Sequence, residues 1–132
     1  TAIAAARCGA KSVTANDIDP LTCVGISMNS ELNNISLEII KEDLISKHRY
    51  FENWDIILIG DLFYEFSVMR SLIVMLRNAS QRGKRIFVAE PCGIFRAYTL
   101  GKELSRVAQY NLTAVSEEIL GYRSTVVSEF SV

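Results

Sequence analysis

Residues 54–64 read WDIILIGDLFY, and this stretch indicates the fold more strongly than any other. Trp54–Gly60 is nearly all apolar, and the apolar run ends at Asp61. A continuous apolar strand is typical of a parallel sheet that helices cover on both faces, whereas a strand with one wet face alternates apolar and polar residues. The stretch therefore predicts a buried strand of an α/β sheet, with an acid at its carboxyl end.

On both sides of this strand, strand-like and helix-like segments alternate. The predicted strands are 12–17, 37–41, 54–60, 85–89, 112–117 and 124–130, the last two joined through Gly121 as an antiparallel return. The predicted helices are 1–8, a helix opened by Asp19-Pro20, 66–81 and 95–109. Leu21, Val24, Met28 and Leu32 fall on one face of the second helix. This alternation predicts one α/β domain over residues 1–132, doubly wound and mostly parallel, with an antiparallel last strand.

Four of the predicted strands are each followed by an acid. These acids are Asp17, Asp43, Asp61 and Glu90. Ligands of open α/β sheets bind outside the carboxyl ends of the strands, so this edge is where a site is expected.

Asp17 can accept hydrogen bonds from both ribose hydroxyls of an adenosine-containing cofactor, and a turn residue next to the helix cap Asp19 is the alternative. Asp43, in KEDL, is a candidate for the adenine side, and a solvated loop acid is the alternative. Asp61, Phe63 and Tyr64 can wall a pocket and aim a substrate amine. Their alternative is a helix cap followed by two core aromatics.

Composition excludes several classes of function. A net charge of −1 argues against a general nucleic-acid binder, and no apolar run approaches the length of a membrane span. A single histidine, His48, supports no Ser/His/Asp or Cys/His arrangement, and three widely spaced cysteines lack the spacing of a zinc site. No metal and no membrane or nucleic-acid partner is predicted.

The run TAIAAARCGAKSVTANDIDP at 1–20, followed in register by WDIILIGDLFY, resembles class I, seven-stranded, Rossmann-like methyltransferases that use S-adenosylmethionine. The resemblance is nearest to the lysine methyltransferases of the electron transfer flavoprotein β subunit, and it is more distant to ribosomal-protein methyltransferases. It implies Asp17 as the ribose ligand and Asp43 beside the adenine. It also implies Asp61 and Tyr64 at the methyl-transfer site, with Phe63, Glu90 and Pro91 on the substrate side.

The sequence, which starts at Thr1, contains no match to that family's first strand and glycine-rich turn. The resemblance implies that this strand would lie between the strands ending at Asp17 and Asp61, so the chain corresponds either to part of a longer product or to a degenerate copy.

Three alternatives to a lysine methyltransferase stay open. They are a non-catalytic pseudoenzyme or partner-binding module, a nicotinamide-dependent enzyme, and a methyltransferase of ribosomal protein or small molecules. The resemblance further implies a protein substrate, the electron transfer flavoprotein β subunit. It implies a mitochondrial matrix location in a eukaryote and a cytoplasmic one in a bacterium.

Overall fold

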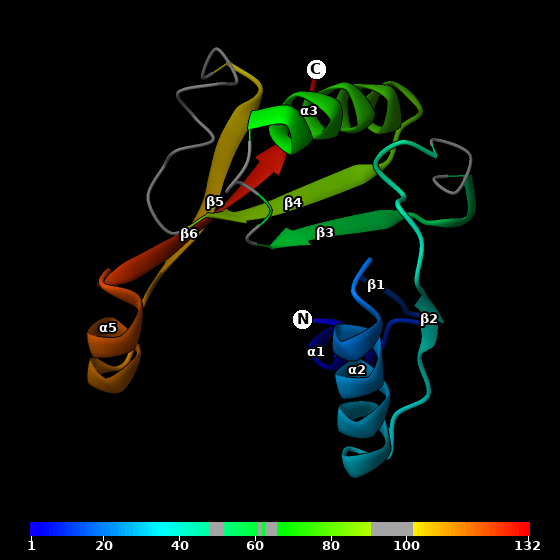
Figure 1. Cartoon of the computed structure of the whole chain (residues 1–132). Helices are drawn as coiled ribbons and strands as arrows, with labels where there is room; N and C mark the ends of the chain where they lie inside the picture. The colour runs from blue at the N-terminus through cyan, green and yellow to red at the C-terminus, as the bar shows by residue number, and fades with distance from the viewer. Residues whose placement is uncertain (48–51, 61, 63–65, 91–101) are drawn as a thin grey trace. The chain divides into compact units, whose positions relative to one another are not determined.

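The structure is a computed structural model that describes residues 1–47, 52–60, 62, 66–90 and 102–132. The chain divides into two compact units, Thr1–Lys47 and His48–Val132. Figure 1 shows the helices and strands of both units.

The first unit joins two parallel strands to two helices. Its elements are α1 (Ala2–Arg7), β1 (Thr14–Asn16), α2 (Pro20–Leu32) and β2 (Glu38–Ile40). The predicted start of α2 is confirmed, because Asp19 is the N-cap, its side chain accepts from Leu21 N, and Pro20 is the first helical residue. Gly9, with φ of 92°, follows α1 as predicted. β1 and β2 pair in parallel, with Ala15 opposite Ile39.

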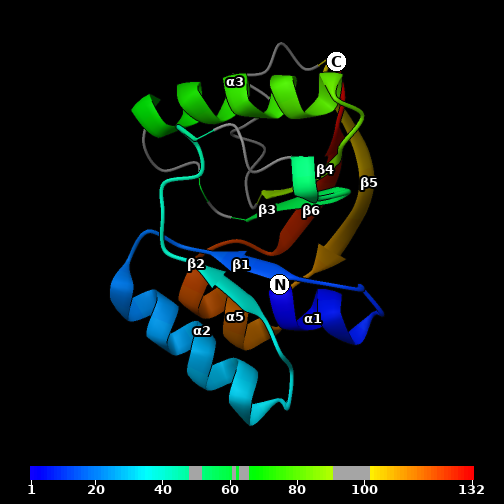
Figure 2. The same cartoon turned by 90° about the vertical axis from the view of Figure 1, so that its right-hand side faces the viewer.

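Helix α2 packs against β2, beside the β1–β2 pair (Figure 2). Cys23 and Ser30 are each 8% exposed, whereas Leu21 and Leu32 are each 79% exposed. The apolar stripe of the helix therefore faces away from the sheet of its own unit. The spacing of apolar residues located the helix, but it did not identify the face that packs.

The second unit is a four-stranded sheet with one long helix across it. Its elements are β3 (Ile56–Gly60), α3 (Phe66–Gln81), β4 (Arg85–Glu90), β5 (Leu104–Asn111), α5 (Ala114–Leu120) and β6 (Ser124–Phe130). The strand order is β3-β4-β6-β5, with β3 parallel to β4 and β6 antiparallel to both of its neighbours. Three strands thus run one way and the last strand runs the other way, as predicted.

The core of the second unit lies between α3 and one face of this sheet (Figure 1). The helix contributes residues at the predicted spacing, including Leu72 and Leu76, which are fully buried. The sheet contributes residues that alternate along β3, β4 and β6, as a one-sided core requires, and Leu104 of β5. The buried residues among those described in the second unit are Met69, Leu72, Met75, Leu76, Ala79, Ile57, Ile59, Ile86, Val88, Leu104, Ser128 and Phe130.

Strand 54–60 is predicted to be covered on both faces, but within the second unit it is covered on one face. Ile57 and Ile59 are buried at 9% exposure each, but Ile56 is 51% exposed and Leu58 is 44% exposed. The reason is that α3 packs on one face of the sheet, so that only the residues of β3 on that face are buried. β4, which has a neighbour on each side, is the central strand beside it.

Two predictions in the last third are corrected. Residues 104–109, expected in a helix over 95–109, belong to strand β5, and the part before residue 102 lies outside the described residues. A bulge between Arg106 and Ala108 inserts Val107 and interrupts the alternation of β5, so its apolar residues are spaced as in a helix. Residues 114–117, expected in a strand, open helix α5, which Thr113 caps and Gly121 ends in the left-handed region at φ of 77°.

Candidate functional site

Two of the predicted acids lie at the same edge of the first unit. Asp17 directly follows β1 and Asp43 lies three residues beyond the end of β2, and these strands are parallel. Their carboxyl ends therefore meet at one edge, where a ligand of an α/β sheet binds. In the second unit, Glu90 is the last residue of β4 and pairs with Val126. Asp61, Phe63, Tyr64 and Pro91 lie outside the described residues.

Asp17 is held between the sheet and the start of α2. Its amide donates to Ile40 O at 3.3 Å, which extends the β1–β2 ladder by one bond. Its Oδ1 accepts from Asp19 N at 2.9 Å, and its carbonyl accepts from Cys23 Sγ at 3.3 Å. Among the described residues no donor reaches Oδ2 of Asp17, so this oxygen is available to a hydroxyl donor of a ligand.

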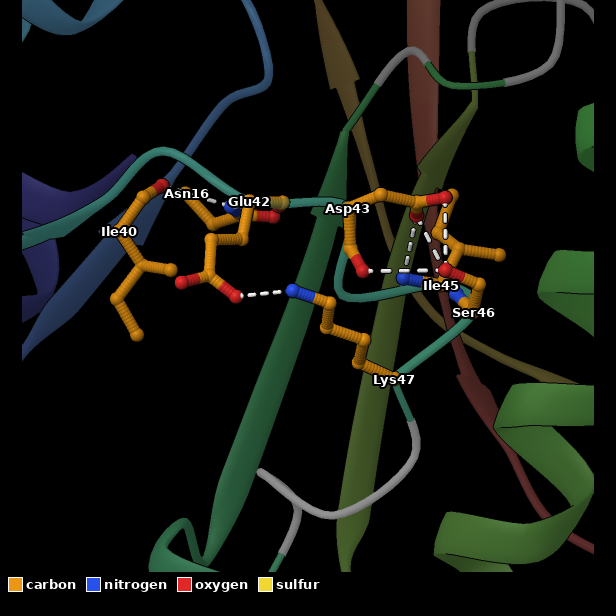
Figure 3. A network of polar contacts seen from close by, with 7 residues as sticks. All are labelled: Asn16, Ile40, Glu42, Asp43, Ile45, Ser46 and Lys47. Atoms are coloured by element: carbon orange, nitrogen blue, oxygen red, sulfur yellow. Dashed lines mark hydrogen bonds and ion pairs between the residues drawn. The ribbon is translucent and has the colours of Figure 1, made fainter.

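Asp43 is held by the turn that follows it (Figure 3). Its Oδ1 accepts from Ile45 N at 2.9 Å and from Ser46 N at 3.3 Å, and its Oδ2 accepts from Ser46 Oγ at 2.9 Å. The Ser46 hydroxyl, helped by the two backbone amides and by the charge of Lys47, lowers the pKa of the Asp43 carboxyl, although partial burial opposes this effect. Asp43 is therefore ionised at neutral pH and fixed in one orientation.

Asn16 is a residue of this edge that the sequence did not single out. Its Nδ2 donates to Ile40 O at 2.8 Å and to Glu42 O at 2.9 Å (Figure 3). Both acceptors lie on the segment that leads from β2 to Asp43. A signal was present, because Asn16 is a donor-bearing residue at the end of a strand next to a candidate acid. Its role depends, however, on a pairing with residues 24 and 26 positions away.

The arrangement offers hydrogen-bond acceptors rather than a metal site. No group of three or more His, Cys, Asp or Glu residues that can hold a metal ion occurs among the described residues. Two carboxylates at one sheet edge suit a neutral ligand rich in hydroxyl and amino donors, such as a nucleoside. In the part of the chain that the structure describes, none of the helices is sufficiently long and apolar to span a bilayer.

Comparison with known proteins agrees with this chemistry. Residues 1–83 match the family described as ribosomal protein L11 methyltransferase (PrmA). An electron transfer flavoprotein beta subunit lysine methyltransferase from Danio rerio is 33% identical over 135 residues, which cover 99% of this chain and 52% of the relative. The Xenopus laevis protein of the same name is also 33% identical, over 98% of this chain and 53% of its own length. The chain thus spans about half the length of these curated relatives.

Solved structures support the fold. A ribosomal protein L11 methylase from Lactobacillus delbrueckii subsp. bulgaricus superposes with a TM-score of 0.64 at 17% identity, over 99% of this chain and 64% of that one. A putative S-adenosylmethionine-dependent methyltransferase from Streptococcus mutans gives 0.63 at 16% identity, over 96% of this chain and 40% of that one. The predicted Rossmann-like α/β fold of methyltransferases is confirmed.

Proposed function

The chain belongs to the ribosomal protein L11 methyltransferase (PrmA) family, and from this membership we propose that it is an S-adenosylmethionine-dependent protein-lysine N-methyltransferase. The proposed substrate is the β subunit of electron transfer flavoprotein, because the two relatives at 33% identity carry that name. The observation that carries the proposal is the pair of carboxylates, Asp17 and Asp43, at one edge of the parallel β1–β2 pair.

In this proposal the first unit holds the adenosine end of the cofactor. Oδ2 of Asp17 accepts from the ribose hydroxyls, while Oδ1 stays bonded to Asp19 N. The turn from Asp43 to Ser46 lies beside the adenine, where the remaining acceptor capacity of the Asp43 carboxylate suits the exocyclic amino group. The ionised state of Asp43 favours this role, because an ionised carboxylate is a pure acceptor.

Methyl transfer would take place at Asp61 and Tyr64. S-adenosylmethionine supplies an electrophilic methyl group when it is bound. The attacking lysine must be neutral, although its ordinary pKa is about 10.4. A pocket to which Phe63 and Tyr64 contribute would disfavour the ammonium form and lower the pKa of the lysine. Asp61 would orient the amine and accept its proton through water, and Glu90 and Pro91 would serve the protein substrate. Positioning and the exclusion of water supply most of the rate.

Calorimetric titration with S-adenosylhomocysteine tests the adenosine site. The unchanged protein should bind, and Asp17→Ala should bind at least about 100-fold more weakly, because it loses charge-assisted hydrogen bonds of about 1.5–3 kcal/mol each. Asp55→Ala is the control, since Asp55 is an exposed acid at the amino end of β3. Equal affinity of Asp17→Ala and Asp55→Ala would remove Asp17 from the site.

A methylation assay tests the substrate. Electron transfer flavoprotein β subunit and ribosomal protein L11 are offered separately with S-adenosylmethionine, and methylated lysines are located by mass spectrometry. Methylation of the flavoprotein subunit is expected, with loss of transfer but retention of cofactor binding in Asp61→Ala. Methylation of L11 alone would replace the proposed substrate. Cofactor binding without transfer to either protein would favour a partner-binding role.

The proposed location follows the proposed substrate. In a eukaryote we place the protein in the mitochondrial matrix, where such a substrate is encountered, and in a bacterium in the cytoplasm. Imaging of a tagged full-length protein in a eukaryotic cell checks this assignment.

A further inference from the structure

The two acids of the proposed adenosine site lie on separate segments, and each accepts hydrogen bonds from its own segment. Asp17 is fixed at the start of α2 by Asp19 N and by Cys23 Sγ. Asp43 is fixed by its own turn through Ile45 N and Ser46. The distance between the two carboxylates therefore depends on what joins the end of β1 to the segment beyond β2.

The side chain of Asn16 connects the end of β1 with the segment beyond β2 through hydrogen bonds (Figure 3). The ladder between β1 and β2 ends with the bond from Asp17 N to Ile40 O. Asn16 Nδ2 reinforces that last rung at Ile40 O and then reaches past it to Glu42 O at 2.9 Å. Glu42 is the residue directly before Asp43. Both N–H groups of one carboxamide thus hold the segment that carries the second acid against the strand that carries the first.

We propose that Asn16 is a positioning residue for the cofactor, which sets the spacing of Asp17 and Asp43 so that both engage one adenosine. This inference rests on the proposed function. Asn16 acts through the two acids and does not itself contact the ligand. Its side chain lies at an exposed position, so the hydrogen bonds contribute more to the geometry of this edge than to the core of the unit.

The substitution that isolates this role is Asn16→Asp. Aspartate has the shape of asparagine, but an ionised carboxylate cannot donate and would repel the carbonyl oxygens of Ile40 and Glu42. Binding of S-adenosylhomocysteine should weaken by about tenfold or more, which is the effect of losing one well-aligned charge-assisted bond. Asn29→Asp is the matched control, because Asn29 Nδ2 also donates to a backbone carbonyl, Gly25 O at 2.8 Å, but within α2.

A double-mutant cycle separates positioning from a general effect on folding. Asn16→Ala should weaken binding in the unchanged background, but by less than about twofold in an Asp43→Ala background, where no second acid remains to be aligned. A residue that only stabilises the unit would give the same factor in both backgrounds, and this result would overturn the proposal. Thermal unfolding of each variant confirms that it is folded at the temperature of the titration.

The outcomes distinguish the two levels of the proposal. If the unchanged protein binds no S-adenosylhomocysteine, the proposed function fails and the positioning role fails with it. If the unchanged protein binds and Asn16→Asp binds as well as Asn29→Asp does, only the role of Asn16 is refuted. Weakened binding by Asn16→Asp, together with the loss of this effect in the Asp43→Ala background, supports both.

Discussion

The two units of the chain are stabilised in different ways. In the second unit, α3 buries a row of large side chains against the sheet, and Leu72, Leu76, Ile86 and Val88 have no exposed surface. In the first unit the buried apolar side chains are Ala15, Cys23 and Leu44, with 7–8% exposure each. The acids proposed for the cofactor thus belong to the unit with the smaller core. There, side-chain hydrogen bonds rather than burial determine where the functional groups lie.

Helix α2 itself has one face that packs and one apolar face that stays exposed. It packs small and polar side chains on the β1–β2 pair and leaves an apolar stripe exposed, from 56% at Val24 to 79% at Leu21. Burial contributes about 25 cal/mol per Å² of apolar surface, so this stripe adds little to the stability of the structure described here.

The largest expected effect is on the core of the second unit. Leu76→Ala should lower the free energy of unfolding by about 2–5 kcal/mol, because it leaves a cavity at a fully buried position. Leu21→Ala, the matched control on α2, should change it by about 0.5 kcal/mol or less. Urea unfolding followed by the fluorescence of Trp54 measures the first variant, and circular dichroism compares both. Comparable losses would show that the stripe on α2 is buried in solution.

Hydrogen exchange should separate the units without any mutation. Amides of α3 and β4 are expected to exchange about 100-fold more slowly than those of β1 and β2, because local opening costs less where few apolar contacts are broken. Mass spectrometry of peptides from 66–81 and 85–90 against 12–17 and 37–41 measures the ratio. Equal protection would mean that the two units open together. Addition of S-adenosylhomocysteine should slow exchange chiefly in the first unit.

The sequence predicted elements that are determined by local signals. Asp19 and Pro20 marked the start of α2, and the spacing of Met69, Leu72 and Leu76 gave α3 with its observed bounds. Prediction failed where pairing between residues far apart in the sequence determines the secondary structure or the exposure of a residue. Val107 forms a bulge against β6, which removes the alternation that would have identified β5. Nothing local showed that Ile56 and Leu58 belong to an edge strand with one exposed face.

The candidate site divides in the same way. The sequence predicted that Asp17 and Asp43 share an edge, because both follow strands and alternating α/β chains place those ends together. It did not predict the contribution of Asn16 to this edge. The hydrogen bond of that side chain to Ile40 O depends on the register of the two strands, which places Asn16 opposite Ile40. The hydrogen bonds that hold Asp43 are local and could have been predicted from the sequence, because a serine three residues beyond an aspartate is typical of such a turn.

A smaller effect is expected at the helix caps. Asp19→Ala should destabilise the protein by about 1 kcal/mol, because Leu21 N loses its acceptor at 2.9 Å. Thr113→Ala removes the matching cap of α5 in the second unit, where Thr113 Oγ1 accepts from Ser116 N at 3.2 Å. Exchange of the α2 amides should rise in the first variant only, and exchange of the α5 amides in the second only. A change in both helices for either variant would contradict the separation of the two units.

The smallest effect concerns two carboxyl groups whose pKa values are lowered by different partners. Hydrogen bonds from the neutral Ser46 side chain and from the backbone of Ser46 and Ile45 lower the pKa of Asp43. The hydrogen bond from the Arg85 guanidinium to Glu129 Oε1, at 2.9 Å, and the charge of that guanidinium lower the pKa of Glu129. Each lowered pKa adds stability that is complete above the ordinary value of the group and is lost as the pH falls through the folded-state value.

Salt should separate the two groups, because mobile ions screen an exposed ion pair but not a hydrogen bond to a hydroxyl. In a carboxyl-carbon NMR titration at about 1 M salt, where the screening length is about 3 Å, the pKa of Glu129 should return toward its ordinary value. The pKa of Asp43 should stay low. Ser46→Ala should raise this pKa at any salt concentration, because it removes the Ser46 hydroxyl, whose hydrogen bond is the largest cause of the lowered value. A salt-induced rise at Asp43 equal to that at Glu129 would mean that charge, and not the turn, holds this acid in its ionised state.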